Sequence, residues 1–124
     1  MAKVLVVDDE PAFADFAKIL LEGLGHAAVI CLESARAVET ALTLHPDLII
    51  TDLNMPFVDG LQLIDALKKN PDTRSIPILL ASSSTDKSDR IEAQRLGAVY
   101  SIVKPLQTPI LKALLDQILS MKKP

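Results

Sequence analysis

The feature that most constrains the fold is a regular alternation between short apolar runs and longer segments with helical spacing. The runs are rich in Val, Ile and Leu, as in strands that are buried on both faces of a parallel sheet. They cover residues 3–7, 27–31, 47–51, 76–81 and 99–103. An amphipathic segment follows each run after a short connection. Five such repeats predict an α/β fold: a five-stranded parallel sheet with five helices covering its two faces.

Capping residues set the expected helix boundaries. Pro11 suits the first position of the first helix, and Gly25 suits its C-terminal cap. Ser34 is predicted to be the N-cap of a helix that runs to about Leu44, and Thr108 the N-cap of the last helix. The inner face of the first helix is predicted to carry Phe13, Phe16, Ala17, Leu20, Leu21 and Leu24.

The last helix has a broad apolar stripe and a basic end. Lys122 and Lys123 are placed well for the negative end of the helix dipole. The width of the stripe leaves room for a homodimer contact through the last helices. The residues of the stripe are Ile110, Leu111, Leu114, Leu115, Ile118 and Leu119.

Size and composition narrow the class of protein. A chain of 124 residues, 49% of them apolar, is expected to form one domain over residues 1–124, with 121–124 as the start of a linker. The net charge of −3 gives no electrostatic footprint for nucleic acid. No apolar run reaches the roughly 20 residues that cross a bilayer, so no membrane partner is expected. The single cysteine, Cys31, fits a cytoplasmic location.

Carboxylates stand at the ends of two of the predicted strands. Asp8 and Asp9 follow the first strand, and Asp52 follows the third. If these strands are neighbours about 4.8 Å apart, the three side chains crowd one crevice at the carboxyl edge of the sheet. Like charges that close repel one another unless a cation is present, and Mg²⁺ accepts carboxylate oxygens while keeping several waters. The residues therefore predict a shallow Mg²⁺ site.

Two further strand ends bring a hydroxyl and an ammonium to the same edge. Ser82 and Ser83 end the fourth strand, and Lys104 ends the fifth. A hydroxyl and an ammonium beside Asp52 and Mg²⁺ suit contacts with the oxygens of a transferring phosphoryl group. Asp52 itself is suited to attack such a group and form an acyl phosphate. Glu10 has two readings, a helix-start charge or a water-mediated metal contact, and Asp59-Gly60 is read as a turn and helix start.

At this point the chain resembles the receiver domains of bacterial two-component response regulators, in particular the single-domain chemotaxis type. The resemblance spans residues 3–121. It rests on four features in the family's order: the pair Asp8-Asp9, the motif Asp-Leu-Asn-Met-Pro-Phe-Val-Asp-Gly that begins at Asp52, Ser82 after an apolar strand, and Lys104-Pro105. The resemblance implies a flavodoxin-like, doubly wound sheet with strand order 2-1-3-4-5.

The resemblance also implies roles for these residues. Asp52 is the expected phosphoacceptor, with Asp9 as a direct Mg²⁺ ligand and Asp8 acting mainly through water. The backbone carbonyl of Asn54 is expected to contact the metal, Ser82 to hydrogen-bond the phosphoryl group and Lys104 to pair with it. The Lys104–Pro105 bond is expected to be cis. The donor is expected to be a sensor histidine kinase or a histidine phosphotransfer protein, and the chain to catalyse only its own phosphorylation and dephosphorylation.

One position departs from the family pattern. Receivers of this type carry Tyr or Phe three residues before the lysine, where rotation of the ring reports phosphorylation; here that position is Ser101. Tyr100 is one residue away and therefore predicted to lie on the opposite face of the strand. The switch pair of this chain is thus Ser82 and Ser101. The departure leaves open an alternative function, a constitutive protein-interaction module that kept the motif but lost signalling.

A third hypothesis is an aspartate-nucleophile phosphatase, but that class carries Asp-x-Asp after its first strand, whereas Asp8 and Asp9 are adjacent. The sequence does not identify the kinase or the downstream protein target, nor whether the chain is a stand-alone regulator or part of a longer protein.

Overall fold

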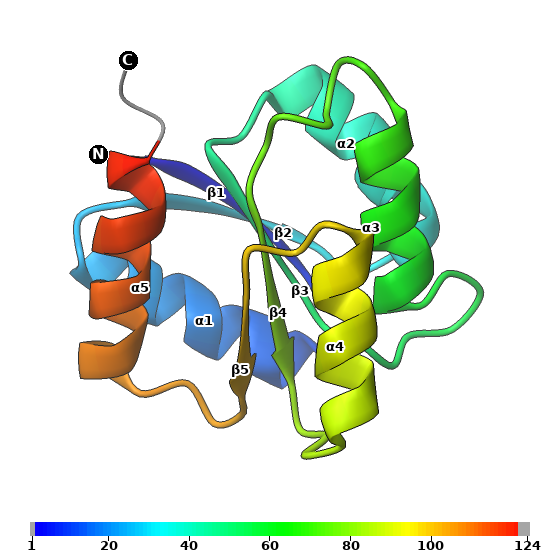
Figure 1. Ribbon diagram of the computed structural model, residues 1–124. Helices are drawn as coiled ribbons and strands as arrows, with labels where there is room; N and C mark the ends of the chain where they lie inside the picture. Colours follow the sequence, from blue (N-terminus) through cyan, green and yellow to red (C-terminus); the bar gives the residue numbers. More distant parts are fainter. Residues whose placement is uncertain (1, 122–124) are drawn as a thin grey trace.

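A computed structural model describes residues 2–121 and shows five parallel strands in one sheet (Figure 1). The strand order is β2-β1-β3-β4-β5, which confirms the predicted flavodoxin-like fold. Neighbouring strands are in parallel register, for example Val7 of β1 beside Thr51 of β3. The strands are β1 (Lys3–Val7), β2 (Ala27–Cys31), β3 (Leu48–Thr51), β4 (Ile78–Ser82) and β5 (Tyr100–Val103).

Helices cover both faces of this sheet. In Figure 1, α1 and α5 lie on one face, and α2, α3 and α4 lie on the other. Each crossover carries the chain from one parallel strand to the next, so every strand points its carboxyl end to the same edge. The helices are α1 (Pro11–Gly23), α2 (Ala37–Leu44), preceded by the short 3₁₀ helix Ser34–Arg36, α3 (Gly60–Lys69), α4 (Lys87–Leu96) and α5 (Thr108–Ser120).

The core is divided by the sheet into two clusters. Successive strand residues point to opposite faces. Leu5 and Ile49 therefore pack under α2, α3 and α4, whereas Val4 and Ile50 pack under α1 and α5. Both faces of the central strands are buried, which explains why these strands have continuous apolar sequences.

Of the three predicted helix caps, Gly25 is correct, and Ser34 and Thr108 are wrong. Gly25 follows α1 with φ 90°, the left-handed conformation of a helix-terminating glycine. Asp59 caps α3 with a reciprocal capping box to Gln62. Ser34 caps nothing, because its hydroxyl donates to the carbonyl oxygen of Pro56 at 3.1 Å, and α2 begins only at Ala37. Thr108 is the first residue of α5, whose N-cap residue, Gln107, makes no side-chain cap bond.

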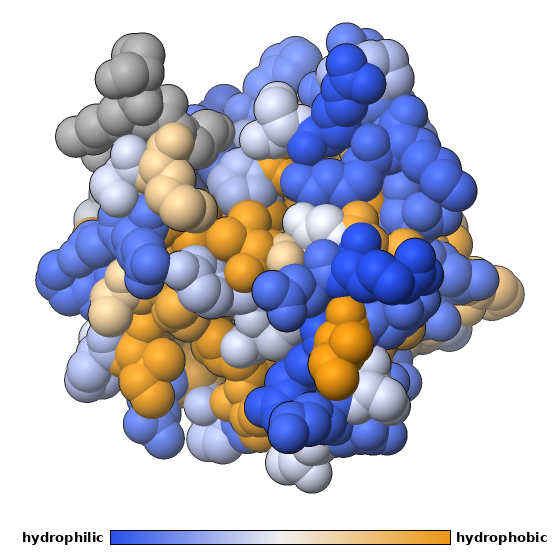
Figure 2. Space-filling model, viewed as in Figure 1, coloured by the Kyte–Doolittle hydropathy of each residue, from blue (hydrophilic) through white to orange (hydrophobic). Residues whose placement is uncertain are grey.

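The prediction that Phe16 lies on the inner face of α1 is also wrong. Its side chain is 43% exposed, and the buried residues of α1 are Ala14, Ala17 and Leu21. These three residues, spaced i, i+3 and i+7, form the buried stripe of α1, and Phe16 lies outside it. In α5, Leu111, Leu115 and Ile118 are buried, whereas Ile110 is exposed. Figure 2 shows apolar side chains gathered over α5 and a mostly polar surface over α3 and α4.

Within residues 2–121, no helix is both long enough and apolar enough to cross a bilayer. The two predicted basic residues at the end of the last helix, Lys122 and Lys123, lie outside the described residues, as does most of the linker predicted over 121–124.

Candidate functional site

Asp8 is fully buried at the carboxyl end of β1, and both of its carboxylate oxygens are in use. Oδ1 accepts a hydrogen bond from the backbone N–H of Glu10 at 2.9 Å. Oδ2 accepts one from Nζ of Lys104 at 2.8 Å. The backbone N–H of Asp8 also donates to the carbonyl oxygen of Cys31, which continues the β1–β2 pairing past the end of the strand. Asp8 is therefore held from three sides and has little freedom to turn.

Asp52 lies beside Asp8 because β1 and β3 are neighbours. The backbone N–H of Asp52 donates to the carbonyl oxygen of Val7 at 3.0 Å, so the pairing between β1 and β3 continues one residue beyond the end of β3. Oδ1 of Asp52 is 3.4 Å from Nζ of Lys104. Lys104 thus bridges the two carboxylates, with its side chain only 16% exposed.

The backbone after Asp52 is held against the start of α3 by Gly60. The N–H of Gly60 donates to the carbonyl oxygen of Leu53 at 2.7 Å. A Cβ atom at residue 60 would overlap the carbonyl oxygen of Asp52 and lie 2.9 Å from Cα of Leu53. Backbone atoms cannot rotate away as a side chain can, so this approach requires glycine. Asp59-Gly60 is structural, as predicted, and it positions the loop that carries Asp52.

Three carboxylates come together at this edge of the sheet. Asp8, Asp9 and Asp52 each offer an oxygen, and these oxygens all lie within 4.8 Å of one another. Asp9 is exposed and lines a cavity of about 410 Å³, whose polar lining includes the positive charge of Lys104. The lining residues are Asp9, Glu10, Asp52, Asn54, Ser83 and Lys104.

The surroundings of Asp52 raise the pKa of its carboxyl group. Burial is the largest cause, and the neighbouring charge of Asp8 adds to it. The hydrogen bond from the backbone of Leu53 and the positive charge of Lys104 act in the opposite direction but do not cancel the effect. The charge of Lys104 outweighs that of Asp8, so the raised pKa of Asp52 is mainly an effect of burial.

Lys104 is positioned by three elements. Its backbone N–H donates to the carbonyl oxygen of Ser82 at 2.8 Å, and the Lys104–Pro105 peptide bond is cis, as predicted. Its Nζ lies 3.8 Å from the centre of the Phe13 ring in α1, a cation–π contact. The sequence indicated Phe13 only as a core residue. Its place one turn after the acidic pair could have signalled this role.

Ser82, the last residue of β4, and Ser83, which follows the strand, are placed differently. Ser82 is buried, and its Oγ accepts a hydrogen bond from the N–H of Ser84 at 3.0 Å. Ser83, which was predicted with Ser82 to bring a hydroxyl to this edge, is exposed and lines the cavity beside Asp52. The structure thus brings the candidate residues from β1, β3, β4 and β5 to one edge of the sheet, and adds Phe13.

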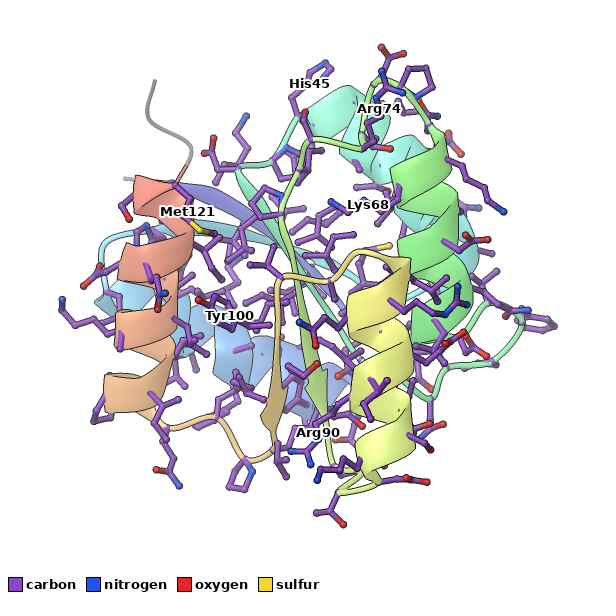
Figure 3. All side chains as sticks on the ribbon, in the orientation of Figure 1. His45, Lys68, Arg74, Arg90, Tyr100 and Met121 are labelled. Carbon is purple, nitrogen blue, oxygen red and sulfur yellow. The ribbon has the colours of Figure 1, made fainter. Side chains whose placement is uncertain are left out.

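Ser101 faces away from this site. Tyr100 and Ile102 pack against the cluster under α1 and α5, and Figure 3 shows Tyr100 on that side of β5. Ser101 lines a groove of about 320 Å³ between α4 and β5, together with Arg90 and Ile91. Tyr100 is therefore on the opposite face from Ser101, as predicted, and does not replace the missing ring.

The residues of the cluster fit a bound Mg²⁺ ion. The donor atoms are hard oxygens, which Mg²⁺ prefers, and the open cavity leaves room for the waters that it retains. A divalent cation would also offset the negative charge of the three clustered carboxylates.

The fold and the acidic edge define a doubly wound α/β protein of the receiver type. The chain matches the response regulator receiver domain family over residues 4–116, and it belongs to that family. Receiver domains are modules of two-component signalling that interact with histidine kinases and downstream effectors, and they generally bind Mg²⁺ at an acidic pocket.

Relatives and solved structures agree with this assignment. The chain is 33% identical over 119 residues to a chemotaxis protein CheY homolog of Campylobacter jejuni, covering 94% of this chain and 92% of that one. It is 32% identical over 105 residues to the DNA-binding dual master transcriptional regulator RpaA of Synechocystis, covering 85% and 44% respectively. The structure of a response regulator from Desulfuromonas acetoxidans superposes with a TM-score of 0.89 at 29% identity, covering 99% and 100%. The chain spans about half the length of the transcriptional regulators that it matches.

Proposed function

We propose that the chain is a phosphoacceptor that takes a phosphoryl group on Asp52 from a histidine kinase or a histidine phosphotransfer protein. The observation that carries this proposal is the position of Asp52 within a cluster of three carboxylates and in contact with Lys104. A single surface carboxylate would have neither the metal-binding neighbours nor the counter-charge that phosphoryl transfer requires.

The transfer forms one bond and breaks one. A carboxylate oxygen of Asp52 attacks phosphorus, and the bond from phosphorus to the donor histidine nitrogen breaks, with its electron pair left on that nitrogen. Lys104, 3.4 Å from Asp52 in the free protein, is placed to pair with the oxygens of the incoming group. The hydroxyl of Ser82 would donate a hydrogen bond to another of these oxygens.

Asp9, Asp52 and the backbone carbonyl of Asn54 would hold Mg²⁺. Asp9 and Asn54 line the open cavity, whereas both oxygens of Asp8 are already engaged by Glu10 and Lys104. This difference supports direct ligation by Asp9 and an action of Asp8 through water. The ion would supply positive charge that offsets the charge of the phosphoryl oxygens.

The chain would catalyse only its own phosphorylation and the hydrolysis of its acyl phosphate, and in the cytoplasm it would switch the binding of a downstream protein. The open cavity supports self-phosphorylation, because a small donor such as acetyl phosphate can reach Asp52 without a partner protein.

The test is phosphorylation by acetyl phosphate in the presence of Mg²⁺, followed by mass measurement of the intact protein. We expect one added phosphoryl group in the natural chain, none in Asp52→Asn, and an unchanged gain in the surface control Asp116→Asn. Absence of an adduct from both acetyl phosphate and a histidine kinase would contradict the proposal in favour of a constitutive interaction module. Sustained turnover of unrelated phosphoesters would indicate a phosphatase.

A further inference from the structure

A chain of hydrogen bonds leads from Ser82 away from the cavity to the start of α4. The backbone N–H of Ser84 donates to Oγ of Ser82 at 3.0 Å. The hydroxyl of Ser84 donates to Oδ2 of Asp89 at 3.0 Å and accepts from the N–H of Asp86 at 3.1 Å. Asp86 is the N-cap of α4, and Asp89 lies in its first turn. Ser84 therefore connects the end of β4 with the beginning of α4.

This arrangement leaves the hydrogen of the Ser82 hydroxyl available. A serine hydroxyl has one donor hydrogen and two acceptor lone pairs. One lone pair of Ser82 is occupied by Ser84, and within residues 2–121 its hydrogen has no acceptor. A phosphoryl oxygen on Asp52 can take that hydrogen, and any movement of Ser82 toward the oxygen pulls on Ser84.

The strand β5 offers no comparable connection. Across the described chain, the Ser101 hydroxyl makes no side-chain hydrogen bond, and the position carries no ring that could turn. The neighbouring side chains, Tyr100 and Ile102, are packed into the opposite core cluster. A change at Ser82 thus reaches β5 only through the backbone ladder.

The helix α4 is suited to move because it is weakly anchored. Ala93 is its only buried residue, and Ile91 is 60% exposed. Segments with few buried apolar contacts shift at low free-energy cost. Lys87 and Arg90 project from the same helix, and Figure 3 shows Arg90 near the carboxyl ends of β4 and β5.

We infer that Ser84 and Asp89 carry the phosphorylation signal from Ser82 to the N-terminal turn of α4, in place of a ring on β5. Ser84 contacts Ser82 through its backbone N–H and Asp89 through its side-chain hydroxyl, so the hydroxyl of Ser84 is the link between β4 and the helix. The surface that changes is the α4 side of the groove, with Lys87, Arg90 and Ile91. This inference rests on the proposed function, since it requires a phosphoryl group on Asp52.

The test compares hydrogen–deuterium exchange with and without beryllofluoride and Mg²⁺, which form a stable mimic of the aspartyl phosphate. In the natural chain we expect a difference over residues 84–96 and little over 99–103. Ser84→Ala and Asp89→Ala, which remove the donor and the acceptor of the Ser84–Asp89 hydrogen bond, are expected to lose that difference. Ser84→Thr, which keeps the hydroxyl, is expected to retain it. Ser88→Ala is the matched control, because its hydroxyl bonds Asp86 at the same helix start but is not part of the chain.

Acetyl phosphate labelling separates the possible failures. The Ser84 and Asp89 variants are expected to gain one phosphoryl group like the natural chain, which also shows that they are folded. An unchanged exchange difference in both Ser84→Ala and Asp89→Ala overturns the inference and leaves the proposed function intact, as does a difference confined to 99–103. No labelling of the natural chain overturns the proposed function and the inference together.

Discussion

Lys104 donates a hydrogen bond of 2.8 Å to Asp8, a carboxylate that is fully buried and 96 residues away in the sequence. The same ammonium is 3.4 Å from the proposed phosphoacceptor, Asp52. Lys104 therefore has a structural role in the free protein besides any role in phosphoryl transfer, because it neutralises a charge that water cannot reach.

Replacing Lys104 by Met is expected to destabilise the protein by about 3 kcal/mol in the absence of Mg²⁺, since it leaves Asp8 buried without its cation. Urea denaturation with EDTA measures the loss. Lys112→Met is the control: its pair with Asp116 is exposed, and its removal should change stability by less than about 1 kcal/mol. Equal stabilities of the two variants would show that Asp8 does not depend on Lys104.

The second prediction concerns pH. The pKa of Asp52 is raised by burial, so the folded protein binds this proton more tightly than the unfolded chain. Ionised Asp52 therefore costs stability. This cost is complete above the raised pKa and disappears as the pH falls through it toward the unfolded value of about 3.9.

Asp52→Asn is accordingly expected to be more stable than the natural chain at pH 7 in EDTA, by roughly 2–4 °C in Tm. The difference should shrink at low pH and also when Mg²⁺ is added, because the ion offsets the same charge. Thermal unfolding at several pH values measures it. If the natural chain were more stable than Asp52→Asn at pH 7 without Mg²⁺, the predicted direction of the stability change would be wrong.

The third prediction tests the contact between Gly60 and the backbone of Asp52. Gly60→Ala places a Cβ against backbone atoms, and we expect a loss of about 1–3 kcal/mol together with weaker Mg²⁺ binding, because the loop from Asp52 must move. Gly23→Ala is the control: nothing lies within 4 Å of the added Cβ, so stability should be unchanged or rise by up to about 1 kcal/mol. Titration with Mg²⁺ measures the affinity. If Gly60→Ala bound Mg²⁺ as tightly as the natural chain, Gly60 would have no positioning role.

Phe57 supplies a fourth prediction. Its side chain is 94% exposed and its backbone has φ 69°, at the centre of a turn in which the N–H of Val58 donates to the carbonyl oxygen of Pro56 at 2.8 Å. The left-handed region costs an L-residue about 1–2 kcal/mol, whereas glycine adopts it freely. Phe57→Gly should therefore raise stability by roughly 1 kcal/mol in urea denaturation, less the added entropy of the unfolded chain. Phe57→Ala keeps the strain and should show no such gain; a gain of equal size would trace the effect to the ring instead.

The fifth prediction concerns the groove beside Ser101. A tyrosine at this position can enter the space of about 320 Å³ between α4 and β5 and pack near Ile91. Because aromatic residues favour strands, Ser101→Tyr is expected to raise stability by up to about 1 kcal/mol relative to Ser101→Ala, with unchanged phosphoryl uptake from acetyl phosphate. If Ser101→Tyr lost phosphoryl uptake, Ser101 would contribute to phosphoryl transfer, contrary to its position in the groove.

Local patterns were enough to predict much of this protein. The continuous apolar runs identify parallel strands buried on both faces, and parallel strands necessarily bring Asp8, Asp9, Asp52, Ser82 and Lys104 to one edge. Alternation along β5 also places Tyr100 and Ser101 on opposite faces. These conclusions need only the periods of secondary structure and the direction of the chain.

Tertiary structure alone decided which atoms meet. Phe16 fits the apolar spacing of α1 but is exposed, because the helix turns Ala14, Ala17 and Leu21 toward the core instead. Ser34 has the chemistry of an N-cap, yet its hydroxyl bonds Pro56 from a distant loop. Likewise Asp8 is closed off by Lys104 while Asp9 stays open, and Ser82 is joined to α4 through Ser84. The residues involved lie on different elements, and a hydrogen bond needs a match of a few tenths of an ångström, which sequence spacing cannot provide.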